Sequence, residues 1–326
     1  MSERERLEMI EISLYERGMR DEWDTFCSSA KNGTMLHRRG YMDYHSDRYS
    51  DYSLVARDDG GKIVAVLPAC RQDETVTSHG GLTYGGWVMP LRHFDATTML
   101  AVMDSAVYFL RRQGVKKLIY KPVPHIYHSY PAEEDLYALF RHGARPAGCN
   151  VSTVIELSRA LPPDRGCKSG ISHALRSGIE TKVPTDFDGE IDQFWAMLTE
   201  LLESRYGTRP VHTIDEIKLL HSRFPGEIKL VTAHERGEPV AGAVLYVTAG
   251  VAHCQYIAST ARGRDNRALT LLLHKAVEWA GEQGLRYFDF GTSNEDGGRV
   301  LNEGLLQQKA RLGGRAIAYP TFSIII

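Results

Sequence analysis

Apolar and polar positions along the chain follow two periods, and the same succession of patterns occurs twice. In each half, two apolar runs with strand-like spacing flank a glycine-containing turn, and an amphipathic run with helical spacing and a further apolar run follow. Gly61 and Gly237 hold the same place in the two turns, and Gly114 and Gly284 follow the two helical runs. The first copy covers residues 52–68 and 96–121, and the second covers residues 228–258 and 267–291. Such an internal repeat predicts two similarly folded halves.

The remaining patterns fill the space between these copies. Strands are predicted at 8–16 and 151–157, and helices at 21–27, 133–142, 192–206 and 215–224, with a helix start at 171–178. Residues 160–170 carry prolines and glycines and are the predicted linker. We therefore expect an α/β (α+β) protein of two tandem domains, 1–160 and 161–326, each with a mixed, largely antiparallel sheet flanked by helices. A length of 326 residues agrees, because single cores usually divide beyond about 250–300 residues.

Composition narrows the function classes only slightly. A net charge of -2 gives no general attraction to DNA. The five cysteines have no C-x-x-C spacing, which predicts free thiols and no metal site. His125 and His128 lack a third ligand at metal spacing. The N-terminus leads into no apolar signal region, and no apolar run approaches the ~18 residues of a membrane span, so we expect a cytoplasmic protein without an integral membrane segment.

At this point the ordered motifs resemble a known family. The second half resembles the Gcn5-related acyltransferase (GNAT) fold, and the whole chain is similar to the FemAB-type, double-GNAT bacterial acyltransferases. The residues that carry the resemblance are Trp23-Asp-Thr-Phe26, Asn32-Gly-Thr-Met-Leu-His37, Gly80-Gly-Leu-Thr-Tyr-Gly-Gly86, Tyr256-Ile-Ala with Leu269–Trp279, Asp289-Phe-Gly291, and Gln308-Lys309 before Gly313-Gly314. The resemblance implies two GNAT-like domains that share a cleft, with donor binding and chemistry in the second and the acceptor side in the first.

The expected donor site is the N-terminus of the helix that begins near residue 267. Arg262, Arg264 and Arg267 stand there, and helix N-termini favour phosphate groups, so acyl-CoA is the expected co-substrate. The alternative is a solvated basic turn. The stretch also departs from the family, because Ala261–Ala268 contains one glycine and three arginines where ordinary GNAT enzymes have a glycine-rich pyrophosphate loop.

Three residues are the predicted catalytic groups. Asp289 ends a central strand and would accept a proton or orient the amine, or else cap the following turn. Lys309 matches the family lysine that meets phosphate or developing negative charge, or else is an exposed helix lysine. Tyr256 lies on the neighbouring strand and would protonate the leaving group, or else belongs to the core.

The acceptor is predicted to contact polar and aromatic side chains from several loops. Aromatic residues beside glycines suit a flat ligand, and a packed interface is the alternative. The segment after Asp289 is polar and glycine-rich, and function concentrates in such loops. The predicted substrate-binding residues are Tyr84, Trp87, Arg205, His212, Glu295, Asn302 and Glu303.

The sequence therefore predicts an acyltransferase that moves an acyl group from an acyl-CoA-type thioester to an amine of a small-molecule, peptide or cell-envelope acceptor. One alternative is aminoacyl-tRNA-dependent transfer onto a peptidoglycan-type amine. The basic stretch 165–182 would suit tRNA, whereas the absence of a sustained heptad run counts against it. The other alternative is a non-catalytic ligand-binding protein that kept the fold. The sequence does not indicate the oligomeric state.

Overall fold

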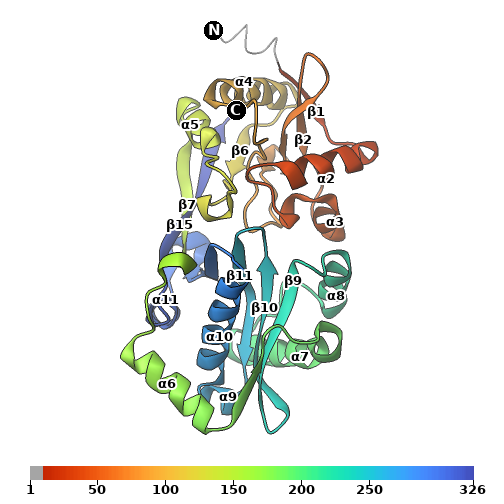
Figure 1. The fold of residues 1–326 in the computed structure, drawn as a ribbon. Coiled ribbons are helices and arrows are strands. Elements are labelled where there is room, and N and C mark those ends of the chain that lie inside the picture. The colour runs from red at the N-terminus through yellow and green to blue at the C-terminus, as the bar shows by residue number, and fades with distance from the viewer. Residues whose placement is uncertain (1–9) are drawn as a thin grey trace. The chain divides into compact units, whose positions relative to one another are not determined.

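The computed structural model describes residues 10–326, which form two compact units (Figure 1). Unit 1 contains the residues up to 150 together with 297–299 and 318–326, and unit 2 contains 151–296 and 300–317. The last strand therefore returns to unit 1. The sequence places the boundary at residue 160 and does not anticipate this return.

Unit 1 contains an antiparallel sheet of order β1-β2-β3 and the strand series β4-β5-β6-β15, in which β5 and β6 run parallel. Its strands are β1 (Ile10–Leu14), β2 (Leu54–Asp58), β3 (Ile63–Leu67), β4 (Cys70–Gln72), β5 (Thr75–Thr77), β6 (Lys117–Tyr120) and the end of β15 (Arg315–Ile325), and its helices are α2 (Arg20–Ser29), α3 (Arg39–Met42), α4 (Ala96–Arg112) and α5 (Glu134–Arg141). Of the strand predicted at 8–16, residues 8 and 9 lie outside the described residues.

Helix α4 shows how the sequence pattern builds this core. The carboxylate of Asp95 caps its first turn by accepting a hydrogen bond from the amide of Thr98 at 2.9 Å. Met99, Met103 and Leu110 recur at helical spacing and are fully buried. They pack with Trp87 and other side chains of the sheets in one hydrophobic cluster.

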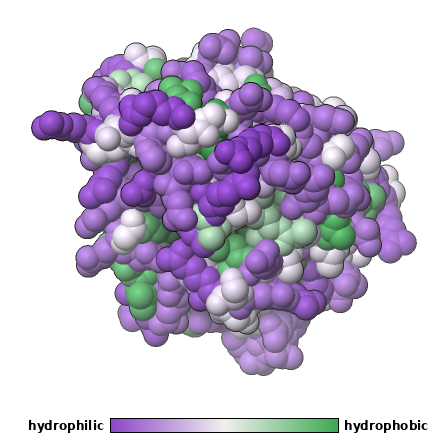
Figure 2. All heavy atoms as spheres, turned by 90° about the horizontal axis from the view of Figure 1, so that it is seen from below, coloured by the Kyte–Doolittle hydropathy of each residue, from purple (hydrophilic) through white to green (hydrophobic). Residues whose placement is uncertain are grey.

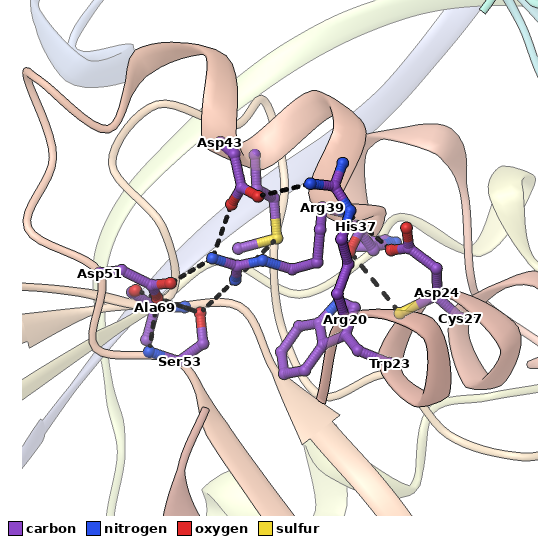
Figure 3. A network of polar contacts seen from close by, with 11 residues as sticks. Arg20, Trp23, Asp24, Cys27, His37, Arg39, Asp43, Asp51, Ser53 and Ala69 are labelled. Carbon is purple, nitrogen blue, oxygen red and sulfur yellow. Dashed lines mark hydrogen bonds and ion pairs between the residues drawn. The ribbon is translucent and has the colours of Figure 1, made fainter. Parts of the chain in front are cut away.

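A buried arginine organises the segment before β2 (Figure 3). The guanidinium of Arg39 forms ion pairs with Asp43 at 2.7 Å and with Asp51, and it lies 3.8 Å from the ring centre of Tyr15. The backbone amide of Arg39 donates to Asp24. Because a buried charge is costly without partners, these contacts fix the path of the chain around α3.

Unit 2 contains the strand series β7-β12-β11-β10-β9-β8. Neighbouring strands are antiparallel except β11 and β12, which run parallel. The strands are β7 (Arg145–Glu156), β8 (Ile179–Lys182), β9 (Ile228–Glu235), β10 (Glu238–Val247), β11 (Val251–Ser259) and β12 (Tyr287–Thr292), with the short hairpin β13 (Asn294–Glu295) and β14 (Val300–Leu301). The helices are α6 (Arg165–Arg176), α7 (Phe187–Tyr206), α8 (Ile214–Arg223), α9 (Ala261–Asp265), α10 (Ala268–Glu282) and α11 (Glu303–Arg311).

Helices cover both faces of this sheet. Apolar side chains of α6 and α10 share a cluster with Ala241, Ala243, Phe288 and Phe290. On the opposite face, α7 packs so closely that a Cβ on Gly242 would lie 2.5 Å from the ring of Phe194. A side chain on β11 or β12 therefore faces either α10 or α7, according to its position along the strand.

The expected fold class is confirmed, and the differences are shifted ends of elements and two elements that were not predicted. The predicted linker 160–170 is wrong in its second part, because α6 begins at Arg165. Asp164 caps that helix by accepting from the amide of Cys167 at 2.7 Å. Helix α11 and strand β15 were not predicted.

The surface seen from below is mostly hydrophilic, with hydrophobic side chains gathered in small areas (Figure 2). Among the described residues, no helix is both long and apolar enough to cross a membrane.

Candidate active site at the ends of β11 and β12

The parallel strands β11 and β12 pair over three residues only, from Val251 to His253 and from Tyr287 to Asp289. Strand β12 then bends at Gly291, whose φ of 77° favours glycine. A Cβ at Gly291 would approach the carbonyl oxygen of Cys254 to 3.2 Å. Beyond Asp289 the backbone edges of the two strands are therefore no longer joined by a ladder.

Strand β11 carries a β-bulge at the same level. Val244 of β10 is opposite Tyr256, whereas the next residue, Leu245, is opposite Cys254, so Gln255 is the additional residue. The bulge changes the alternation of side chains along β11. As a result Tyr256 contacts Trp195 of α7, while Cys254 belongs to the cluster on the α10 face. Gln255 and Tyr256 are half-buried, unlike the buried residues before them.

A buried carboxylate joins the strands where their pairing ends. Asp289 has no exposed surface. Its Oδ2 lies 2.8 Å from Nδ1 of His253. Its Oδ1 accepts from the hydroxyl of Ser152 and from the amide of Gly291 at 2.9 Å. The carboxylate thus orients a histidine as well as capping the turn at Gly291.

The side chain of Lys309, on α11, also contacts the end of β12. Its ammonium group donates to the carbonyl oxygens of Gly291 and Thr292, both at 2.8 Å, and to the hydroxyl of Ser293 at 3.0 Å. Burial lowers the pKa of Lys309 to about 8, against the opposing effects of Cys254 and Asp289. All three donors of the ammonium group have acceptors, so Lys309 fixes the backbone bend.

Tyr256 belongs to a second polar group on the α7 face. Its hydroxyl contacts Nδ1 of His212 and accepts from the backbone amide of His212 at 3.3 Å. The ring packs edge-on against Trp195, with ring centres 5.1 Å apart. His212 is buried, and the exposed Val211 precedes it. Arg205, predicted to act with His212, is exposed and lies 5.8 Å from the ring centre of Tyr206.

The predicted donor loop is a compact turn. Thr260 caps α9 by accepting from the amide of Gly263, and the amides of Arg264 and Asn266 donate to the carbonyls of Thr260 and Arg262. Arg267 then takes a left-handed conformation with φ of 58° before α10 begins. The amides of Gly263, Arg264 and Asn266 are thus engaged inside the turn.

Two of the three arginines of this turn also have partners. The guanidinium of Arg262 forms an ion pair with Glu235 at 2.6 Å, and Arg264 donates to the carbonyl of Ser259 at 2.8 Å. Glu235 additionally accepts from the side chain of Asn266. A carboxylate therefore already lies among the groups that the sequence assigns to phosphate. All three arginines remain exposed.

The other predicted binding residues lie in different settings. Asn302 caps α11 by accepting from the amide of Leu305 at 3.0 Å, and its amide group donates to Glu295 at 3.4 Å. Glu295 and Glu303 are exposed. In unit 1, Tyr84 and Trp87 are only 3% and 0% exposed, which suits packing inside the unit.

Asp289, Lys309 and Tyr256 were predicted from the sequence as catalytic groups, but two partners of Asp289 were not predicted. His253 and Ser152 both contact Asp289. A signal for His253 was present, because it interrupts the apolar run at 251–254. Its parallel pairing with Asp289 could not be deduced from this pattern.

Known proteins share this architecture. Residues 165–296 match the family model described as acetyltransferase (GNAT) domain. The whole chain has the fold of FemX and of a tandem GNAT protein, in agreement with the fold that the resemblance implied.

Solved structures show the same fold along nearly the entire chain. FemX superposes with a TM-score of 0.68 at 14% identity, covering 97% of this chain and 97% of that chain. The C-terminal domain of a putative lysylphosphatidylglycerol synthetase from Agrobacterium fabrum gives 0.61 at 13%, covering 99% and 92%. A tandem GNAT protein from the clavulanic acid biosynthesis pathway gives 0.52 at 14%, covering 97% and 98%. No curated protein sequence matches the chain.

Proposed function

We propose that the protein is an N-acyltransferase that joins an activated acyl group to an amine where β11 and β12 cease to pair. The observation that carries the proposal is the coincidence of the Gln255 bulge with the end of pairing at His253 and Asp289. Backbone N–H groups that leave a ladder at such a point can donate to an acyl carbonyl. Donors fixed in this way stabilise the negative charge that develops on the oxygen as the amine attacks.

The predicted catalytic residues take different parts in this proposal. Tyr256 on β11, whose hydroxyl contacts His212, would protonate the leaving group. Lys309 donates hydrogen bonds to the carbonyl oxygens of Gly291 and Thr292, and so would fix the backbone of β12 beside the acyl site. Glu295, Asn302 and Glu303 follow β12 and would contact the acceptor amine or its substituents.

The donor follows from the turn before α10. Because the amides of Gly263, Arg264 and Asn266 are engaged inside this turn, we infer that the donor's phosphates contact the guanidinium groups of Arg262, Arg264 and Arg267. An acyl-CoA bound through these side chains is the first candidate. Aminoacyl-tRNA is the second candidate. Amines of small molecules, peptides or cell-envelope precursors are the proposed acceptors, and a cytoplasmic location is part of the proposal.

A transfer assay with a panel of donors tests the proposal. The purified protein is incubated with acetyl-CoA, with longer acyl-CoAs, or with a mixture of charged tRNAs, each with a panel of amines, and products are identified by mass spectrometry. We expect an N-acylated product from one donor class. Sensitivity to ribonuclease would identify the tRNA donor. Saturable calorimetric binding of donor without any transfer would instead indicate a non-catalytic binding protein and contradict the proposal.

A further inference from the structure

We propose that His253 is the general base of this site, with Asp289 as its positioning residue. The inference rests on the proposed function, and it names the group that removes the proton from the attacking amine. An amine needs such a group, because its nitrogen becomes positively charged as it attacks.

The geometry assigns the tautomer of His253. Nδ1 lies 2.8 Å from Oδ2 of Asp289. The other carboxylate oxygen of Asp289 accepts two hydrogen bonds, from Ser152 and from the Gly291 amide. An ionised carboxylate only accepts, so Nδ1 carries the hydrogen and Nε2 keeps its lone pair. Among residues 10–326, Nε2 has no hydrogen-bond partner of its own, which leaves it available to a substrate.

His253 and Asp289 differ in solvent exposure, and this difference distinguishes the base from the residue that positions it. The side chain of Asp289 is fully buried, whereas that of His253 remains 11% exposed. Both oxygens of Asp289 are engaged, so a substrate amine would contact the imidazole rather than the carboxylate. Tyr256 is a poorer base, because its hydroxyl already contacts His212 and an ordinary phenol is protonated at neutral pH.

The surroundings of His253 add few charges. Tyr246 is its cross-strand neighbour on β10, and Cys254 follows it on β11. Burial raises the pKa of the Cys254 thiol, so this group is neutral. From α11, Lys309 acts electrostatically on both Asp289 and Cys254. Helix α7, which packs on β11, contributes the buried apolar side chains Ile191, Phe194, Trp195, Met197 and Leu198. Asp289 is thus the carboxylate that stabilises a protonated His253.

The step can be written with its atoms balanced. The amine nitrogen forms a bond to the acyl carbon, and one of its protons passes to Nε2 of His253. The bond between the acyl carbon and the sulfur or oxygen of the donor then breaks, and the leaving group takes a proton from Tyr256. His253 and Tyr256 return to their starting states by exchanging a proton with solvent. No oxidant or reductant is needed.

The chain offers a selective substitution. In His253→Asn the amide nitrogen of the new side chain replaces Nδ1 as donor to Asp289, while the atom that accepts the proton is lost. We expect kcat/KM to fall by at least ~100-fold, the usual contribution of a general base. Donor binding measured by calorimetry should stay within about threefold. The control is His274→Asn, which removes a histidine–carboxylate pair with Glu278 on α10, away from the site; its activity should be unchanged.

The pH profile distinguishes catalysis from structure. In the wild type, kcat/KM should rise with pH through one ionisation on the acidic limb, and that limb should be absent in His253→Asn. A folded His253→Asn variant that retains its activity within about threefold, or that keeps the acidic limb, would overturn the proposal.

A second measurement does not depend on activity. Nitrogen NMR of the wild-type imidazoles, assigned by comparison with His253→Asn, should show hydrogen on Nδ1 and none on Nε2 at neutral pH. Hydrogen on Nε2 would overturn the inference even if no donor supports transfer. Absence of transfer by the wild type with the predicted tautomer present would count against the proposed function and not against the placement of His253.

Discussion

Replacing Lys309 by methionine tests whether this lysine supports the bend at the end of β12. The substitution removes three hydrogen bonds, to Gly291, Thr292 and Ser293, from a charged donor. Bonds of this kind contribute about 1.5–3 kcal/mol each, or at least ~4 kcal/mol together. The substitution also removes the cost of burying the charge. A pKa near 8 instead of 10.5 corresponds to roughly 3 kcal/mol at ~1.4 kcal/mol per unit.

The balance predicts a net loss of about 1–3 kcal/mol near pH 7, because two carbonyls lose their donor. The sign of the pH effect follows from linkage. Between pH 8 and 10.5 the unfolded chain keeps the Lys309 proton while the folded chain has lost it, so this group makes wild-type stability rise with pH in that window. The disadvantage of Lys309→Met should therefore grow by up to ~3 kcal/mol from pH 8 to pH 10.5.

Urea unfolding at several pH values, followed by circular dichroism, measures both quantities. The matched control is Lys275→Met, which removes an exposed lysine that pairs with Glu278 on α10. It should change the free energy of unfolding by less than about 1 kcal/mol. A Lys309→Met variant as stable as this control, or a difference from wild type that does not change with pH, would show that Lys309 does not support the bend of β12. If the role of Lys309 is to hold the backbone of Gly291 and Thr292, Lys309→Met should weaken donor binding as well as lower the free energy of unfolding.

Three further predictions concern other parts of the chain. Burial raises the pKa of the Asp135 carboxyl from 3.8 to about 7, so the folded state holds an extra proton between these two pH values and the free energy of unfolding should fall as pH rises through them. Asp135→Asn should remove this decline, a few kcal/mol in size, in urea titrations at pH 5 and pH 8. Gly291→Ala places a methyl group on a residue with positive φ, 3.2 Å from the carbonyl oxygen of Cys254, so it should lower turnover by at least ~10-fold. The control is Gly281→Ala on α10, where a Cβ meets nothing within 4 Å, and its turnover should be unchanged. Arg39→Met should destabilise unit 1 by ~1–3 kcal/mol in thermal melts, because Asp43 and Asp51 lose the cation that joins them; an unchanged melting temperature would contradict that role.

Periodicity predicted the elements whose hydrophobic pattern is strong. The strands flanking the turns at Gly61 and Gly237, helices α4 and α10, and strand β12 occur within a few residues of the predicted bounds. Elements without a strong pattern were missed. Helix α11 has one buried residue, Lys309, and β15 is an irregular strand whose partners are far away in the sequence. Such elements depend on tertiary pairing that no local pattern encodes.

For the candidate site, the sequence indicated single residues but not their relations. Asp289 was identified from its place at a strand end, yet its contact with His253 depends on the register between β11 and β12. The Gln255 bulge is likewise a property of pairing with β10. For the donor turn, the sequence indicated three arginines, whereas the ion pair of Arg262 with Glu235 depends on the position of β9, where Glu235 lies.

A crystal structure with an unreactive analogue of the donor that supports transfer, for example a ketone in which a methylene group replaces the reactive sulfur or oxygen, would locate the acyl group. We expect its carbonyl oxygen to accept a hydrogen bond from the backbone of β11 after His253, close to the Gln255 bulge. We also expect Nε2 of His253 to face the position of the incoming amine. An analogue bound with its acyl group elsewhere on the chain, while β11 stays unoccupied, would contradict the proposed function.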